Sequence, residues 1–144
     1  MYSKILIGYD GSDVSLSALD AGIELGKKFG SKILLVSIIE RVIIPSPDGA
    51  ILPLVDVMST IEKEVRKMAN DKLQELNKKF PDLDFHLIIK EGRPSQEIVQ
   101  IAIDELADLI VLGHCGHRGL VERIMGSTSH YISNHAPCSV LIVR

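Results

Sequence analysis

One run of eight residues restricts the fold more than any other part of the chain. Residues 32–39 read KILLVSII, so apolar side chains occupy almost every position instead of every second one. A strand that is apolar on both faces needs cover on both sides, which is typical of a parallel sheet between layers of helices. The sequence therefore predicts an α/β protein.

Four further short apolar runs alternate with segments of helical period. The runs are residues 4–9, 84–90, 108–112 and 139–143, and the predicted helices begin at Ser12 or Asp13, Ser59, Ser95 and Thr128. Ser59 and Glu62 have the spacing of a capping box. The first helix is expected to stop at Gly30, because glycine favours the left-handed turn at a helix end. This order predicts one domain over residues 1–144, an open five-stranded parallel sheet with helices on both faces.

The composition fits a core that needs no metal or disulfide. The chain has 144 residues, 46% hydrophobic and 24% charged, and at this length about 70% of the unfolded chain's surface can be buried. The net charge of -3 argues against nucleic-acid binding driven by bulk charge. No apolar run reaches the roughly 18 residues of a membrane span, and no leader is visible before Ile5. We therefore expect a cytoplasmic protein that binds neither nucleic acid nor a membrane.

The carboxyl ends of the predicted strands carry the candidates for ligand binding. In open α/β sheets, ligands bind beyond these ends, where the strand order reverses. The residues there are Asp10, residues 38–40, residues 91–93 and the segment that starts at Gly113. We expect them to converge on one crevice.

The segment after the fourth predicted strand combines glycines with hydroxyl residues. Its form is G-x2-G-x9-G-S-T, with Gly113, Gly116 and Gly126 followed by Ser127 and Thr128. Glycine adopts backbone angles forbidden to other residues and lets a ligand approach the chain closely. The last three residues lie at a predicted helix start, where unpaired N–H groups and the helix dipole favour an anion. These residues alone leave two interpretations open: a phosphate cradle, or ordinary turn glycines.

Four stretches resemble the universal stress protein family. They are ILIGYDGS, EGRPSQEIVQIA, DLIVLGHCGHRGL and MGSTSHYISNHAPCSVLIV, and the resemblance covers essentially the whole chain. The pattern G-x2-G-x9-G-[ST] marks the branch of that family whose members bind ATP. The resemblance implies a Rossmann-like fold of the adenine nucleotide alpha hydrolase type. It also implies a dimer that pairs through the last strand.

The resemblance implies a binding site at the strand ends. ATP, with Mg²⁺ or Mn²⁺ held by its phosphates, would lie against the glycine segment, where the backbone amides from His114 to Gly119 are expected to be available. Asp10 would face the adenosine, and Gly8 and Ile38 would lie against the base or ribose. The implied binding residues are Gly8, Asp10, Ile38, Gly113, His114, Gly116, His117, Arg118, Gly119, Gly126, Ser127 and Thr128.

The histidines and cysteines in the last part of the chain raise the alternative of a metal site. The residues with suitable side chains are His114, Cys115, His117, His130, His135 and Cys138. They form no C-x2-C or H-x3-H pair, which favours loop and surface roles. His114, Cys115 and His117 also stand where many members of the resembled family have Ser or Thr, His or Arg. This departure concerns the side-chain contacts with the ligand at these three positions. The backbone contacts that the resemblance implies do not depend on it.

No catalytic motif accompanies the cradle. The sequence lacks a G-x-S-x-G elbow, a GK[ST] loop and a lysine in the cradle to neutralise a terminal phosphate. Arg118 and Arg123 are candidates for phosphate contact, although loop arginines are usually solvated. We expect a nucleotide-binding module in stress response or signalling, with at most slow ATP hydrolysis. The alternatives are a nucleotide-independent dimeric interaction protein and a slow ATP hydrolase.

Three surfaces bear on partners. The strand Ser139 to Val143 is short and apolar, and an open sheet edge there predicts a homodimer. The apolar stretch Ile43 to Val57 is interpreted as a loop packed on its own domain, or as a lid or patch for an unknown protein partner. The lysine-rich segment Lys63 to Lys79 is interleaved with acidic residues, which indicates a solvated helix face.

Overall fold

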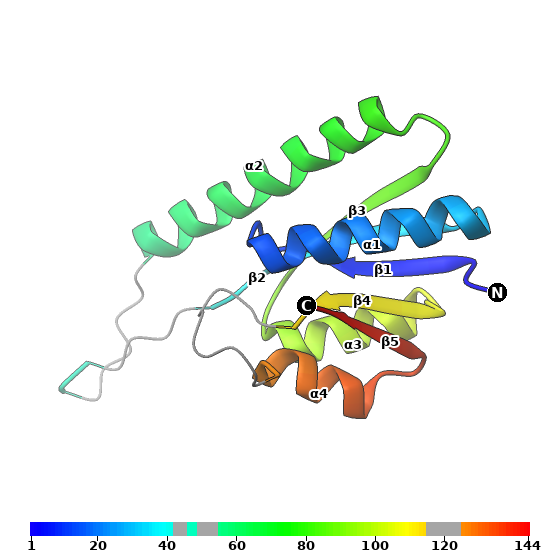
Figure 1. Cartoon of the computed structure of the whole chain (residues 1–144). Coiled ribbons are helices and arrows are strands. Elements are labelled where there is room, and N and C mark those ends of the chain that lie inside the picture. Colours follow the sequence, from blue (N-terminus) through cyan, green and yellow to red (C-terminus); the bar gives the residue numbers. More distant parts are fainter. Residues whose placement is uncertain (42–45, 49–54, 115–124) are drawn as a thin grey trace.

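The computed structural model describes residues 1–41, 46–48, 55–114 and 125–144. Strands and helices alternate along these parts of the chain (Figure 1). The strands are β1 (Lys4–Gly8), β2 (Lys32–Ile39), β3 (Asp84–Glu91), β4 (Leu109–Gly113) and β5 (Ser139–Val143). The helices are α1 (Asp13–Phe29), α2 (Val55–Lys79), α3 (Pro94–Asp104) and α4 (Ser127–His135).

The five strands form one parallel sheet in the order β3-β2-β1-β4-β5. The central strand β1 pairs with β2 on one side, where Ile5 lies opposite Ile33, and with β4 on the other, where Ile5 lies opposite Leu109. The predicted five-stranded parallel α/β sheet is confirmed. The strand β5 forms one edge of this sheet, as the sequence predicts.

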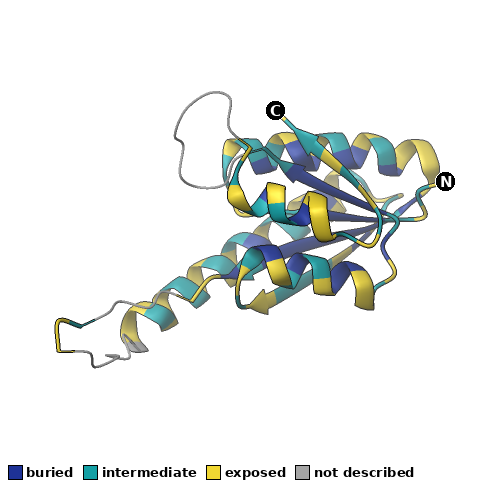
Figure 2. Ribbon diagram, turned by 90° about the horizontal axis from the view of Figure 1, so that it is seen from below, coloured by how far each residue is buried: buried dark blue, intermediate teal, exposed yellow. Residues whose placement is uncertain are grey.

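Two hydrophobic cores lie on opposite faces of the sheet. Ile5 and Ile7 of β1 belong to a core that includes Leu19 of α1 and Leu76 of α2. The intervening residue Leu6 belongs to a second core, with residues of α3 and α4. Figure 2 shows the buried strands between these two helical layers. The sheet is covered on both sides, which is why the strands are apolar on both faces.

The first helix begins and ends at the residues that the sequence predicts. The hydroxyl oxygen of Ser12 accepts a hydrogen bond from the Ser15 N–H at 3.2 Å and caps the start of α1. Gly30 ends the helix with a φ of 64°, and its N–H bonds to the Gly26 carbonyl. This left-handed conformation favours glycine.

Two predicted helix starts are wrong. Helix α2 begins at Val55, so Ser59 and Thr60 lie inside it, and both hydroxyls donate to the Asp56 carbonyl. A serine or threonine hydroxyl inside a helix can bond a carbonyl one turn back instead of capping the helix start. Helix α3 begins at Pro94 instead of being capped by Ser95, because proline has the helical φ already set at the first position.

The charged face of α2 agrees with the interpretation of a solvated surface. Arg66 pairs with Glu62 at 2.9 Å, and Lys67 pairs with Asp71 at 2.7 Å, all on exposed side chains. Within the described ranges, none of the helices has the length and apolar character to cross a bilayer.

Asp108 joins β1 to β4 at the amino ends of these strands. Its Oδ2 atom accepts hydrogen bonds from the Ser3 N–H at 2.8 Å, the Ser3 hydroxyl at 2.6 Å and the Lys4 N–H at 2.9 Å. The Asp108 N–H donates in turn to the Lys4 carbonyl at 3.0 Å. The hydrogen bond from the Ser3 hydroxyl is the main reason why the pKa of the Asp108 carboxyl lies below its ordinary value of 3.8.

We predict that Asp108→Asn lowers the free energy of unfolding by about 1 kcal/mol at pH 7, since an amide accepts these bonds without a charge. The pKa of Asp108 is lower in the folded protein, so its contribution is present above the ordinary carboxyl pKa and is lost as pH falls through the folded-state value. Urea unfolding of both proteins from pH 7 to pH 3 measures this difference, with exposed Asp82→Asn as the control. A difference that stays constant over this range contradicts the prediction.

Candidate functional site

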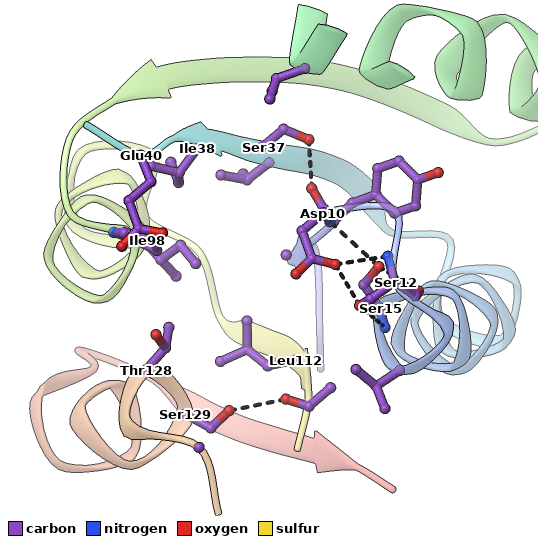
Figure 3. Close-up of a pocket in the computed structure, with 18 of the residues that line it drawn as sticks. Asp10, Ser12, Ser15, Ser37, Ile38, Glu40, Ile98, Leu112, Thr128 and Ser129 are labelled. Atoms are coloured by element: carbon purple, nitrogen blue, oxygen red, sulfur yellow. Dashed lines mark hydrogen bonds between the residues drawn. The ribbon is translucent and has the colours of Figure 1, made fainter. Parts of the chain in front are cut away.

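The strand order reverses at β1, whose two neighbours in the sheet are β2 and β4. A crevice of about 870 Å³ lies beyond the carboxyl ends of these strands (Figure 3). Its described walls come from the ends of all three strands and from the starts of α1, α3 and α4, with part of α2. This is the place where open α/β sheets bind ligands.

The structure brings seven of the predicted binding residues together around this crevice. They are Gly8, Asp10, Ile38, Gly113, Gly126, Ser127 and Thr128. Gly116, His117, Arg118 and Gly119 lie outside the described residues, as do Cys115, Arg123 and most of the apolar stretch between residues 43 and 57.

The expectation for the amide of His114 is wrong. Its N–H donates to the Val143 carbonyl of β5 at 2.8 Å, so it is not available for phosphate. The His114 carbonyl accepts from the Gly126 N–H, also at 2.8 Å. The residue therefore joins β5 to the start of α4, and it is not part of the described lining of the crevice.

The start of α4 forms one polar end of the crevice. Gly126 is the N-cap residue, and no side chain of the described residues caps the helix there. The first-turn N–H groups of a helix have no partner within the helix, and the helix dipole adds partial positive charge. The Ser129 hydroxyl donates to the Gly113 carbonyl at 3.0 Å, which holds the helix start against the end of β4. This end of the crevice is suited to an anion.

A fixed carboxylate lies across the crevice. The Oδ1 atom of Asp10 accepts from the Ser12 N–H at 2.9 Å and from the Ser12 hydroxyl at 2.5 Å. Figure 3 shows Asp10 and Ser12 on one side of the opening and Thr128 on the other. A carboxylate only accepts hydrogen bonds, so this side is suited to a ligand with hydroxyl or amine donors.

The end of β1 is tied to β2 beneath the crevice. The Tyr9 N–H donates to the Val36 carbonyl at 2.8 Å, and the Ser37 hydroxyl donates to the Tyr9 carbonyl at 2.6 Å. These bonds position Asp10, which follows directly. Burial raises the pKa of the Tyr9 phenol, so this side chain stays protonated and neutral near pH 7.

Apolar side chains line the space between the two polar ends. Ile38, Ile98 and Leu112 come from β2, α3 and β4 (Figure 3). A further apolar wall, formed by Ile61, Val65 and Met68 of α2, was not predicted as part of the site. The helical spacing of these residues indicates an apolar face, but not that this face overhangs a crevice. Most ligand pockets combine such apolar walls with a few placed polar groups.

The residues proposed for the metal alternative are dispersed. Among the described residues, no group of three or more His, Cys, Asp or Glu side chains is arranged to hold a metal ion. His130 and His135 are exposed on α4, and Cys138 is half-buried between α4 and β5. Burial raises the pKa of the Cys138 thiol, which makes it less reactive.

Comparison with known proteins gives matches over the full length. The sequence profile of the Universal stress protein family matches residues 1–144. A universal stress protein of Bacillus subtilis, YxiE, is 31% identical over 148 residues, covering 100% of both chains. The protein MJ0531 of Methanocaldococcus jannaschii is 32% identical over 146 residues, covering 100% of this chain and 83% of its own.

Solved structures share the fold. Universal stress protein UspA from Lactobacillus plantarum superposes with a TM-score of 0.85 at 24% identity, covering 99% of this chain and 98% of that one. A universal stress protein solved in complex with cAMP has a TM-score of 0.68 at 24% identity, covering 99% and 97% of the two chains. An Arabidopsis thaliana protein of the same family, solved with AMP bound, has a TM-score of 0.66 at 18% identity, covering 98% and 90%.

The sequence suggests that Gly113 is needed for unusual backbone angles or for close approach of a ligand. The structure gives a different reason for glycine at this position. Gly113 belongs to β4 and is not among the glycines with a positive φ. A Cβ atom on it would lie 2.7 Å from the Val14 carbonyl oxygen, which belongs to the main chain of α1. The residue therefore permits close approach of the first turn of α1 to the end of β4.

We predict that Gly113→Ala lowers the free energy of unfolding by about 1–3 kcal/mol, because the main chain of α1 has to move to make room. Urea unfolding followed by circular dichroism measures the change. An unfolding free energy equal to that of the unmodified protein shows that this close contact is unimportant.

Proposed function

The chain belongs to the universal stress protein family, and on that basis we propose that its crevice binds ATP and that it acts as a dimeric, nucleotide-dependent stress-response module. The observation that carries this proposal is the order of chemical groups along the crevice. Amides at the start of α4, which no described side chain caps, lie on one side, apolar walls in the middle and the Asp10 carboxylate on the other. A nucleotide presents phosphates, a flat base and ribose hydroxyls in one molecule.

Each part of ATP has a partner of matching chemistry. The phosphates lie at the N–H groups and hydroxyls of Ser127 and Thr128, where the helix dipole favours negative charge. The ribose hydroxyls donate to Asp10, whose carboxylate is already oriented by Ser12. The base packs against Ile38 and the apolar wall of α2. The volume of about 870 Å³ falls in the usual range for small-molecule sites.

Structures of related proteins support an adenine nucleotide as the ligand. One universal stress protein was solved with cAMP and another with AMP, and both share this fold. The preference for ATP rests on the sequence pattern G-x2-G-x9-G-[ST] between Gly113 and Ser127. Its central part, from residue 115 to residue 124, lies outside the described residues.

A divalent cation accompanies ATP in this proposal. Asp10, Glu40 and Glu64 line the crevice, and its described lining contains no Lys, Arg or His. Positive charge for the phosphates comes from outside this described lining in our proposal, from Mg²⁺ or Mn²⁺ held by the phosphate oxygens. The same scarcity of cations in the described lining favours binding over rapid hydrolysis, because efficient phosphoryl transfer needs positive groups that stabilise the charge on the transferred phosphoryl group.

The proposed dimer forms through the edge strand β5. This strand pairs with β4, and the described part of the chain places no strand on its other side. Leu141 remains 37% exposed on this edge. An apolar edge strand is usually covered, and in a homodimer a second β5 strand covers it.

The cytoplasmic location and the unknown protein partner expected from the sequence stay predictions.

Release of bound nucleotide tests the proposed ligand directly. We expect protein purified without added nucleotide, then denatured, to release ATP or another adenine nucleotide detectable by chromatography. Calorimetric titration of folded protein, after removal of copurified nucleotide, measures the binding of ATP with Mg²⁺. If no nucleotide is released and ATP gives neither heat nor a thermal shift, the interaction protein without a nucleotide becomes the better interpretation.

We predict that Ser127→Ala with Thr128→Ala weakens ATP binding about tenfold, because two hydroxyl donors to charged oxygens are lost. Calorimetric titration measures the affinity. Ser59→Ala with Thr60→Ala is the matched control, since it removes the same two side chains from an exposed part of α2 outside the crevice. Equal affinities for both double variants rule out the proposed phosphate contacts.

We predict that Leu141→Glu converts the dimer into a monomer without unfolding it, because two carboxylates would face each other across the paired edge. Analytical ultracentrifugation measures the mass, and circular dichroism verifies the fold. The exposed substitution Leu106→Glu is the control, because Leu106 lies in the loop after α3. A dimer that persists in the Leu141 variant places the interface elsewhere.

A further inference from the structure

A second hollow of about 430 Å³ adjoins the crevice. It shares four lining residues with the crevice: Glu40, Pro94, Ser127 and Thr128. Its other lining residues come from the start of α3 and one face of α4: Arg93, Ser95, His130, Tyr131, Asn134 and His135. The two spaces therefore meet at the start of α4, beside the amides proposed to hold phosphate.

The second hollow differs from the crevice in charge. The described lining of the crevice has carboxylates and no basic side chain, whereas the second hollow has Arg93 and the imidazoles of His130 and His135. The carboxylate in the second hollow belongs to Glu40, at the boundary between the two spaces. Arg93 is exposed and makes no side-chain cap to α3, so its guanidinium group is not needed for the helix start. Arginine pairs well with phosphate oxygens.

A flat, rigid platform lies on α4 in the second hollow. The rings of Tyr131 and His135 stack with centroids 4.0 Å apart and an angle of 12° between their planes. The Nδ1 atom of His135 is 2.8 Å from the Tyr131 carbonyl, which fixes the imidazole on its own helix. Asn134 is also held, because its side-chain amide donates to the His130 carbonyl at 3.1 Å. Stacked rings of this kind accept the face of a nucleobase.

We propose that the second hollow binds the distal half of a dinucleoside polyphosphate. This inference rests on the proposed function, which places one adenosine in the crevice and the first phosphates at the start of α4. The phosphate chain continues past Thr128 to Arg93, and the second nucleoside lies on the Tyr131 and His135 rings. The four shared lining residues favour one continuous ligand that extends from the crevice into the second hollow.

Three ligands separate the contributions of the two spaces. ATP tests the crevice alone, adenosine tetraphosphate adds phosphate without a second nucleoside, and diadenosine tetraphosphate adds both. We expect diadenosine tetraphosphate to bind about tenfold more tightly than ATP. Adenosine tetraphosphate is expected to show a smaller gain in affinity over ATP, because it lacks the second nucleoside. Calorimetric titration of the full chain, after removal of copurified nucleotide, measures the three affinities.

Two variants assign this gain to the second hollow. Arg93→Ala and His135→Ala are each expected to weaken diadenosine tetraphosphate about fivefold or more while changing the ATP affinity less than twofold. Arg66→Ala and His86→Ala are the matched controls, because both remove an exposed side chain of the same type outside the two hollows. Circular dichroism verifies that all four variants are folded.

The outcomes distinguish this inference from the proposed function. If ATP binds and diadenosine tetraphosphate binds no more tightly, the inference is overturned and the proposed function stands. The same holds if the Arg93 and His135 variants weaken both ligands equally, or neither. If no ligand binds, the proposed function fails and the inference fails with it.

Discussion

The position of β1 between β2 and β4 is the constraint on which the rest of the structure depends. Parallel strands need crossover connections, and these connections are right-handed. The chain moves from β1 through β2 to β3 in one direction across the sheet, and then from β4 to β5 in the other. Helices α1 and α2 consequently cover one face while α3 and α4 cover the other. The helices diverge where the direction changes, which leaves a crevice beyond the end of β1.

The described lining of the crevice has acidic side chains and no basic one. In the described part of the crevice, the attraction for an anion comes from backbone amides and the dipole of α4, and each such interaction contributes only about 0.3–1 kcal/mol. In the proposed nucleotide complex, apolar contact with the walls and a divalent cation on the phosphates add to this affinity. The carboxylates of Asp10, Glu40 and Glu64 disfavour any phosphate whose charge is not compensated.

His114 connects the anion end of the crevice to the edge of the sheet. Its N–H bonds to Val143 at the end of β5, and its carbonyl accepts from Gly126 at the cap of α4. The Ser129 hydroxyl adds a bond to the Gly113 carbonyl beside it. The start of α4 is thus fixed by β4 and through His114 to β5. The proposed nucleotide site and the proposed dimer edge are parts of one hydrogen-bonded unit.

The sequence by itself determined the strands, the α/β class and the end of the sheet that carries the site, because these follow from local apolar patterns. It also determined both ends of α1, through Ser12 and Gly30. It also singled out seven residues that meet at the crevice. Tertiary structure alone decided that α2 starts at Val55, that its apolar residues overhang the crevice and that α3 and α4 enclose a second hollow. It also committed the His114 amide to β5. The physical reason is that a hydroxyl, an amide or an apolar face has several possible partners, and only packing brings one of them within reach.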